Sequence, residues 1–255
     1  MRCYCVIHHG QPLVPVERPT PQPQGTEVLL KVHAAGLCHT DLHLWEGHYD
    51  IGGGKKLTLA ERGIVPPLTL SHEIVGEVVQ AGPQAGALPE GRPLLVHPWI
   101  GCGQCAACLR GEENICVKPQ SLGVVRPGGF AEYVKLPVGS LIPLPSEIDC
   151  EVGALIEPGS VALYSLERGE SQPGHRIAIL GVGSIGLFIV QWARAKEAGH
   201  IIATDIVDER LQAAKSMGAH TTLNPARTDV AAEVRQITGD GVDIALEVSG
   251  SPQAL

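Results

Sequence analysis

The chain has 255 residues, of which 44% are hydrophobic and 18% are charged, so a buried core is expected and long disorder is excluded. The formal net charge is −8 and the isoelectric point is about 5.7, which argues against nucleic acid or an anionic membrane as a partner. No apolar run approaches the length of a membrane span and no secretory leader is visible, so we expect a cytoplasmic protein with reduced cysteines.

Residues 1–150 alternate short β-type runs with proline and glycine turns. The expected strands lie at 28–34, 73–79, 93–97 and 131–136. Strands at this spacing, with turn residues between them, indicate a compact β-barrel-like domain.

Residues 151–255 follow a different pattern, in which strands and helices alternate. Strands are expected at 177–180, 201–204 and 242–248 and near Thr221, and helices at 184–198, 208–217 and 229–237. Asp208 is the expected N-cap of the second of these helices. The alternation predicts a parallel sheet covered by helices.

Four cysteines lie close together in a lobe at about 97–119. They are Cys102, Cys105, Cys108 and Cys116, with the spacing C-x2-C-x2-C-x7-C. Four thiolates so close can surround one tetrahedral Zn²⁺ with no open position, which is a structural site. A disulfide framework and an iron–sulfur cluster are the alternatives. Cys3, Cys5 and Cys150 have no ligand spacing and are expected to be small buried apolar residues.

A glycine-rich turn connects the expected strand at 177–180 to the following helix. Its sequence, Gly181-Val-Gly-Ser-Ile-Gly186, matches G-x-G-x-x-G in the strand–turn–helix context that the motif requires. The backbone at Gly181, Gly183, Ser184, Ile185 and Gly186 is expected to hold a pyrophosphate at the helix N-terminus.

An acidic residue follows the second strand of this half. Asp205 lies 19 residues after Gly186, where a carboxylate can accept hydrogen bonds from an adenosine ribose and repel a 2′-phosphate. This favours NAD over NADP, although Asp205 could instead be a capping or loop acid. Arg210 could lie near the same ribose, or it could be a solvated helix arginine.

A second group of metal-binding side chains is expected in the first half. Cys38 follows the first expected strand and His72 precedes the next. A thiolate, an imidazole, a third protein donor and water or substrate would complete a catalytic zinc site. Glu157, which precedes Pro158 at the junction of the two halves, is the candidate third donor. The alternative is that Glu157 is a turn residue.

Taken together, these motifs resemble those of the zinc-dependent medium-chain alcohol and polyol dehydrogenases, over essentially the whole chain. The resemblance rests on Gly36-Leu-Cys-His-Thr-Asp41, His72-Glu73 before Ile-Val-Gly, the four-cysteine lobe, Glu157-Pro, Gly181 to Gly186 and Asp205. It implies a GroES-like catalytic domain at 1–150, a Rossmann domain at 151–255, two zinc ions per chain and NAD.

The resemblance also implies roles for single residues. Cys38 and His72 would bind the catalytic zinc, with Glu73 beside it or as an alternate ligand. Thr40 would take the alcohol proton and pass it by way of the cofactor ribose to His43. His39 matches a position that can touch the cofactor pyrophosphate.

The substrate class stays open between two branches of the family. Glu157-Pro-Gly-Ser is like the polyol and threonine dehydrogenase branch, whereas 42–47 and the loop that begins at Gly52 look closer to the simple-alcohol branch. We therefore expect oxidation of a simple or polyhydric alcohol to an aldehyde or ketone, with hydride transfer to NAD. The alternatives are a non-catalytic zinc- and nucleotide-binding protein and a metal-stapled interaction domain.

The expected Rossmann half is short. About four strands can be counted, whereas the full sheet of this fold has six. We therefore expect a form that is shortened at its C-terminus relative to the family's usual chain, and we expect the full-length form to be a homo-oligomer that acts on a small-molecule alcohol.

Overall fold

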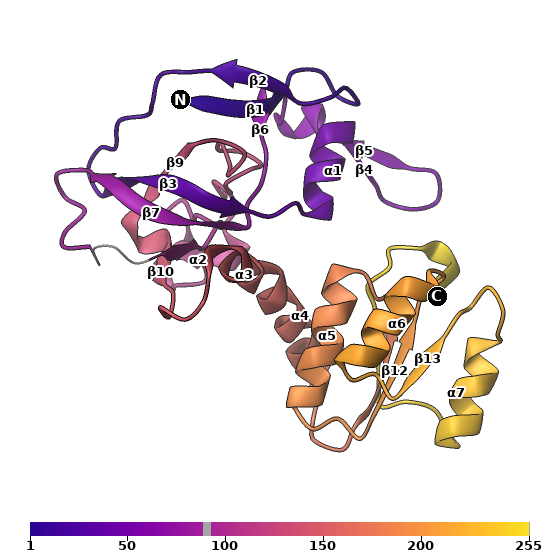
Figure 1. Ribbon diagram of the computed structural model, residues 1–255. Helices are drawn as coiled ribbons and strands as arrows, with labels where there is room; N and C mark the ends of the chain where they lie inside the picture. The colour runs from indigo at the N-terminus through magenta and orange to yellow at the C-terminus, as the bar shows by residue number, and fades with distance from the viewer. Residues whose placement is uncertain (89–92, 255) are drawn as a thin grey trace. The chain divides into compact units, whose positions relative to one another are not determined.

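The computed structural model describes residues 1–88 and 93–254 of the chain, which form two compact units (Figure 1). The first unit is Met1–Ile156 and the second is Glu157–Leu255. This division lies a few residues beyond the change in sequence pattern at 150. Each unit has a hydrophobic core of its own, as expected for a domain.

The first unit is built on an antiparallel five-stranded sheet with the strand order β10-β8-β7-β3-β9. Its strands are β3 (Glu27–Ala35), β7 (Ile74–Ala81), β8 (Leu94–Val96), β9 (Tyr133–Pro137) and β10 (Leu141–Pro143). The first four correspond to the strands expected from the sequence. Positions two apart on each strand meet in one core, as the period of a strand requires. They are Val28, Leu30, Leu94, Val96, Val134 and Leu136.

Shorter elements complete the first unit. A three-stranded sheet has the order β2-β1-β6, and β4 pairs with β5. The elements are β1 (Arg2–Val6), β2 (Val14–Glu17), α1 (His39–Glu46), β4 (His48–Asp50), β5 (Lys56–Thr58), η1 (Ala60–Arg62), β6 (Leu68–Thr69), α2 (Ala106–Leu109), η2 (Glu113–Ile115), η3 (Val138–Ser140) and α3 (Cys150–Ala154). Cys3 and Cys5 on β1 are fully buried, as expected, whereas Cys150 is only half-buried.

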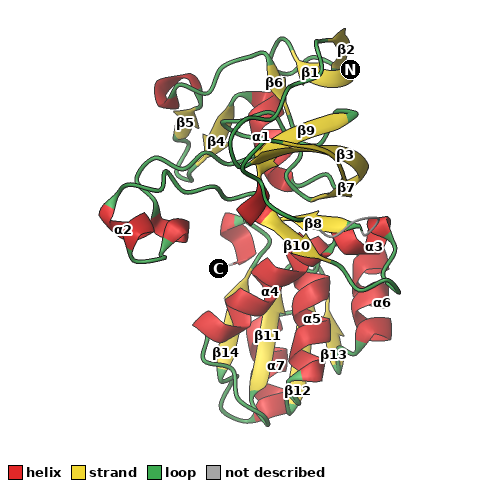
Figure 2. Ribbon diagram, turned by 90° about the vertical axis from the view of Figure 1, so that its left-hand side faces the viewer, coloured by secondary structure: helices red, strands yellow, loops and turns green. Residues whose placement is uncertain are grey.

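The second unit is a parallel sheet with the order β13-β12-β11-β14 (Figure 2). Its strands are β11 (Arg176–Leu180), β12 (His200–Thr204), β13 (Thr221–Leu223) and β14 (Ile244–Glu247). In chain order this is the 3-2-1-4 part of the 3-2-1-4-5-6 order of a dinucleotide-binding sheet. The predicted parallel sheet is therefore present in the described residues.

The helices of the second unit supply much of the apolar surface that packs on this sheet. They are α4 (Ile156–Arg168), α5 (Ser184–Ala195), α6 (Asp208–Met217) and α7 (Val230–Thr238), followed by the short turn η4 (Pro252–Ala254). Helices α5 and α6 lie side by side (Figure 1). Ile189 and Val190 of α5 pack with Ile177 of β11 and Ile201 of β12 in a fully buried cluster.

The expected N-cap of α6 is wrong by one residue. Val207 is the capping residue, and Asp208 is the first residue inside the helix. The Asp208 carboxylate accepts hydrogen bonds from Asn224 at 2.9 Å and from Arg227. These long-range partners take up the oxygens that would otherwise cap the helix.

No helix in the described part of the chain is long and apolar enough to cross a membrane.

Candidate metal and cofactor sites

Cys38, His72 and Glu73 come together in the first unit. One ligand atom from each lies within 4.8 Å of the others. Cys38 caps α1 three residues after the end of β3, and His72 and Glu73 directly precede β7. Because β3 and β7 pair antiparallel, with Ala35 opposite Ile74, the end of one strand meets the start of the other. The sheet therefore brings together the two segments that carry the ligands.

Because Gly36 has no side chain, the Glu73 carboxylate can occupy the space beside it. A Cβ atom at Gly36 would lie 1.9 Å from Glu73 Oε2, so any other residue would displace the carboxylate. The Gly36 amide also donates to the Glu73 carbonyl at 2.8 Å. Glu73 is 5% exposed, and its carboxyl group therefore lies beside Cys38 and His72 in a largely buried place.

Asp41 links the two ligand segments, and the sequence analysis gave it no role. Its Oδ2 accepts the Cys38 amide at 2.9 Å and its Oδ1 accepts the Ser71 amide at 2.9 Å. The first contact belongs to a capping box, in which the third helical residue reaches back to the N-cap. The C-x-x-D spacing of Cys38 and Asp41 was the signal that could have revealed it.

Ser71 adopts a strained backbone next to this carboxylate. Its φ is 75°, in the left-handed region that favours glycine. The Ser71 hydroxyl donates to the Gly36 carbonyl at 2.8 Å, and the Asp41 contact holds its amide. These bonds fix the turn from which His72 projects.

The surroundings of Cys38 favour the thiolate form of its side chain. Burial raises its pKa, but hydrogen bonds with His72 and Thr40 outweigh burial, so the pKa is below the ordinary value for cysteine. The Cys38 Sγ lies 3.6 Å from Thr40 Oγ1. A thiolate is the form that binds metal, and thiolate, imidazole and carboxylate together are a donor set that zinc accepts.

His43 lies on α1 between two other rings. The centroid of the His39 ring is 4.7 Å away and that of the Tyr49 ring is 4.9 Å away. Burial and the neighbouring His39 lower the pKa of His43 below its ordinary value. At neutral pH the ring is therefore uncharged and able to accept a proton.

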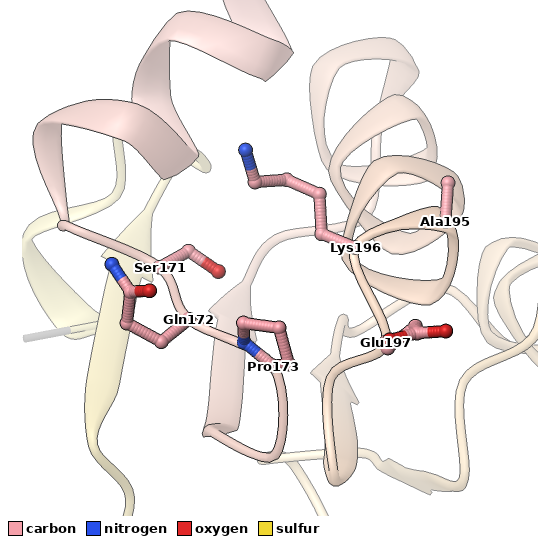
Figure 3. A pocket seen from close by; sticks show the side chains of 6 residues that line it. All are labelled: Ser171, Gln172, Pro173, Ala195, Lys196 and Glu197. Carbon is pink, nitrogen blue, oxygen red and sulfur yellow. The ribbon is translucent and has the colours of Figure 1, made fainter.

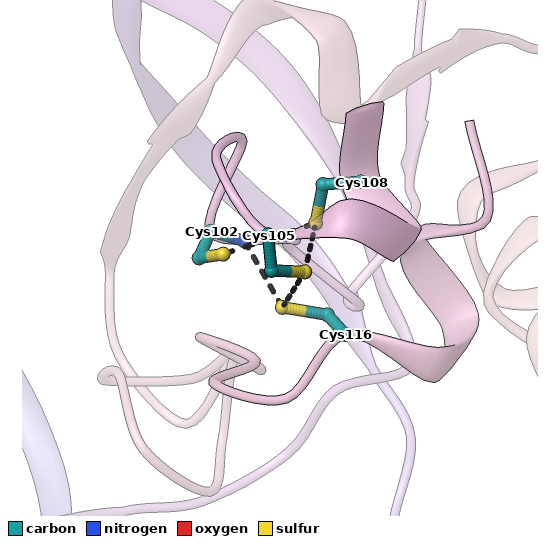
Figure 4. A group of neighbouring side chains, drawn as sticks. All are labelled: Cys102, Cys105, Cys108 and Cys116. Atoms are coloured by element: carbon teal, nitrogen blue, oxygen red, sulfur yellow. Dashed lines mark hydrogen bonds between the residues drawn. The ribbon is translucent and has the colours of Figure 1, made fainter. Parts of the chain in front are cut away.

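The four cysteines of the lobe form the second ligand group (Figure 4). The Sγ atom of Cys108 lies 3.5 Å from that of Cys105 and 3.9 Å from that of Cys102, and Cys105 and Cys116 are 4.0 Å apart. A tetrahedron with Zn–S bonds of about 2.3 Å has edges of about 3.8 Å. All four cysteines are free thiols, so the disulfide alternative is not the arrangement found in this lobe.

The lobe favours a thiolate at Cys105 but needs a cation to hold four thiolates together. The backbone amides of Cys108 and Val117 lower the pKa of Cys105 to about 6. Burial raises the pKa of Cys108 to about 12, and its neighbouring thiols add to the rise. The amides of Cys102 and Lys118 donate to the Cys116 sulfur. This set of donors fits a divalent metal with four thiolate ligands.

The glycine-rich turn lies between β11 and α5, as expected. Gly181 has a φ of 95°, and Gly183 is the N-cap of α5. A Cβ atom at Gly186 would lie 2.1 Å from the Gly181 carbonyl oxygen. The turn can therefore close against the helix only with glycine at this position. Apart from its chain neighbours, no atom of the described residues lies within 4 Å of a Cβ built at Gly183, so the helix N-terminus has space for a phosphate.

Asp205 holds the glycine-rich turn, and its role at the ribose stays a prediction. It follows β12 and is 8% exposed. Its Oδ2 accepts the Val182 amide at 3.0 Å and its Oδ1 accepts the Val207 amide at 2.9 Å. Arg210 Nη1 lies 3.7 Å from Oδ2. A carboxylate has about four acceptor positions, so ribose hydroxyls can still bind.

Glu157 is the second residue of α4 and belongs to the second unit. Its role as the third ligand of the catalytic zinc stays a prediction.

A cavity of about 410 Å³ lies elsewhere in the second unit (Figure 3). It is lined by Ser171, Gln172, Pro173, Ala195, Lys196 and Glu197. These residues precede β11 and β12, whereas the glycine-rich turn follows β11. None of the predicted site residues lines this cavity.

Comparison with known proteins decides the family. The family model described as alcohol dehydrogenase GroES-like domain matches residues 24–146, and the one described as zinc-binding dehydrogenase matches residues 184–255. The chain belongs to the zinc-binding alcohol dehydrogenases. The predicted combination of a GroES-like domain and a nucleotide-binding sheet is thereby confirmed.

Several relatives within this dehydrogenase family are similar over nearly the whole chain. Sorbitol dehydrogenase of Bacillus subtilis (strain 168) is 37% identical over 98% of this chain and 69% of its own length. NAD-dependent alcohol dehydrogenase of Sulfurisphaera tokodaii is 33% identical over 100% of this chain and 73% of its own. The crystal structure of galactitol-1-phosphate dehydrogenase from Escherichia coli superposes with a TM-score of 0.86 at 29% identity, covering 100% of this chain and 70% of that one.

Proposed function

We propose that this protein oxidises an alcohol to an aldehyde or ketone and transfers the hydride to NAD. The observation that carries the proposal is the convergence of Cys38, His72 and Glu73 within 4.8 Å in a member of the zinc-binding alcohol dehydrogenase family. Zinc supplies a Lewis acid that makes the alcohol more acidic, and NAD accepts the hydride.

The residues of the chain then have separate tasks. Cys38 and His72 hold the zinc, with Glu73 beside it and Glu157 as a further proposed ligand. With zinc and NAD bound, Thr40 would accept a hydrogen bond from the alcohol and take its proton, and His43 would be the proton acceptor at the end of the route.

The second unit has the task of binding NAD. Gly181 to Gly186 receive the pyrophosphate at the N-terminus of α5, and Asp205 accepts the ribose hydroxyls. His39 and Arg210 are proposed contacts to the pyrophosphate and the ribose. The four-cysteine lobe keeps a structural zinc.

A polyol is the substrate class that we propose to test first. The stretch Glu157-Pro-Gly-Ser is like the polyol branch of the family, and two similar proteins are a sorbitol dehydrogenase and a galactitol-1-phosphate dehydrogenase. A cytoplasmic location and a homo-oligomeric state are part of the same proposal.

The test is the zinc content per chain together with NADH formation on sorbitol, 2,3-butanediol and ethanol. Cys38→Ser should lose NADH formation and one zinc. Cys150→Ser is the matched control, because Cys150 is a half-buried free thiol outside both ligand groups, and it should keep both. Two zinc ions and bound NAD without NADH formation would support the non-catalytic alternative. Unchanged zinc and turnover in Cys38→Ser would contradict the proposed site.

A further inference from the structure

His43 presents one ring nitrogen to the inside of the protein. Its Nδ1 is buried and makes no hydrogen bond within the described residues. A buried polar atom usually has a partner, because leaving it unpaired costs free energy. The acidic group that faces this atom is Glu46, whose Oε2 lies 3.9 Å from His43 Nδ1.

The helix places these two side chains next to each other. His43 and Glu46 are three residues apart on α1 and therefore share one face. The Glu46 side chain is 44% exposed, so it can rotate by the fraction of an ångström that a hydrogen bond of about 3 Å requires. The Tyr49 ring packs against His43 from β4 and limits rotation of the imidazole.

A second imidazole competes for the same carboxylate oxygen. His48 Nε2 lies 4.0 Å from Glu46 Oε2, and its Nδ1 lies 3.3 Å from the Glu46 carbonyl oxygen. The other titratable groups near His43 are His39 on α1 and Tyr49 on β4. Arg62 and Cys38 act on Tyr49. Within the described residues, Glu46 is the one anionic side chain among the groups that act on His43 directly.

We propose that Glu46 is the carboxylate partner of His43 and fixes the tautomer that carries its proton on Nδ1. The inference rests on the proposed function, in which His43 ends the proton route. With the proton held on Nδ1, the Nε2 lone pair is free to accept the proton from the alcohol, and the imidazolium that forms is stabilised by Glu46. The His43 side chain is 26% exposed, so the proton can then leave to water. Glu46 acts through His43 and is a positioning residue.

The sign of the electrostatic effect follows from the charges. A carboxylate about 4 Å away favours the protonated imidazole and raises the pKa of His43, whereas a protonated His48 opposes this. Because Glu46 is half-exposed, solvent and salt screen its effect on the pKa of His43. Glu46→Gln should therefore lower the pKa of His43, and His48→Asn should raise it.

The experiment is an NMR titration of ¹⁵N-histidine-labelled protein, with His43→Gln to assign the His43 signals. The titration measures the tautomer and the pKa of His43 directly and does not depend on turnover. It can therefore support the proposal even if the protein does not oxidise an alcohol. The native protein should show the Nδ1–H tautomer. Glu61→Gln, on the exposed turn η1, is the matched control and should leave both values unchanged.

Turnover supplies a second measurement in preparations that form NADH. In the plot of kcat against pH, the rising limb should move to lower pH in Glu46→Gln. The plateau value of kcat should fall several-fold, because a weaker base accepts the proton. Glu46→Asp, which keeps the charge, should recover part of the loss. An Nε2–H tautomer in the native protein, or equal His43 pKa values in the native, Glu46→Gln and Glu61→Gln proteins, would overturn the proposal.

Discussion

Replacement of Asp41 by asparagine tests the arrangement that holds the candidate zinc site together. The Asp41 side chain is 1% exposed and accepts amides from Cys38 and Ser71, each at 2.9 Å. Asparagine has nearly the same shape, but its amide group offers one acceptor oxygen and turns donor hydrogens towards the second amide. One of the two amides is therefore left facing another donor.

The magnitude follows from these two bonds. A hydrogen bond to a charged group contributes about 1.5–3 kcal/mol, and a buried group left unpaired costs a similar amount. We expect Asp41→Asn to lower the free energy of unfolding by about 2–4 kcal/mol. For a unit the size of Met1–Ile156, this corresponds to a fall in melting temperature of about 5–15 °C.

The assay combines thermal unfolding with zinc analysis. Besides lower stability, the variant should bind zinc at the Cys38 group more weakly, while the four-cysteine lobe keeps its metal. Asp50→Asn is the control, because Asp50 makes one exposed hydrogen bond, to the Gly52 amide at 2.9 Å, and should change stability by less than about 0.5 kcal/mol. Equal melting temperatures and equal zinc contents in the two variants would refute the reasoning.

Three further substitutions test the remaining sites. Cys105→Ser should remove one zinc per chain by metal analysis and lower the melting temperature, because three thiolates leave the metal open; retention of both zinc ions would argue against the lobe. Asp205→Ser should weaken NAD binding by about tenfold or more, since the glycine-rich turn loses its hydrogen bond at the Val182 amide. It should also narrow the preference for NAD over NADP. An unchanged ratio of kcat/KM for NAD to kcat/KM for NADP would contradict this. His43→Gln should reduce turnover and remove a titration below pH 6.5, because burial lowers the pKa of His43 from that value; identical pH profiles would make His43 structural.

The parts of the sites that were predictable from sequence are those with short spacing. The four cysteines of the lobe and the six residues from Gly181 to Gly186 are each contained in one short segment, so the spacing itself constrains the geometry. Predicting that Cys38 and His72 lie close together needed more than local spacing, because their proximity depends on the pairing of β3 with β7. In that case the family resemblance, and not the local pattern, indicated that the two residues bind one metal.

The side chains that sequence reasoning missed act over longer distances. Asp41 was assigned no role because its second partner, the Ser71 amide, is 30 residues away. Asp208 was expected to cap α6, but it bonds to Asn224 and Arg227, which follow β13. At Asp208 a local capping rule competes with partners that only the folded chain brings near. Asp41 satisfies its capping box and also bonds to such a partner. The capping rule alone predicts neither long-range contact.

Asp41 and Asp205 have the same structural role in the two units. Each carboxylate is nearly buried and accepts two backbone amides from the loops that carry the functional groups. A buried charge is costly unless such bonds compensate it, so each carboxylate can remain in place only while its loops keep their shape. The loops, in turn, need the carboxylate for amides that would otherwise be unpaired. The geometry of both sites is therefore set by the chain itself, and zinc and NAD would meet ligands that are already in position.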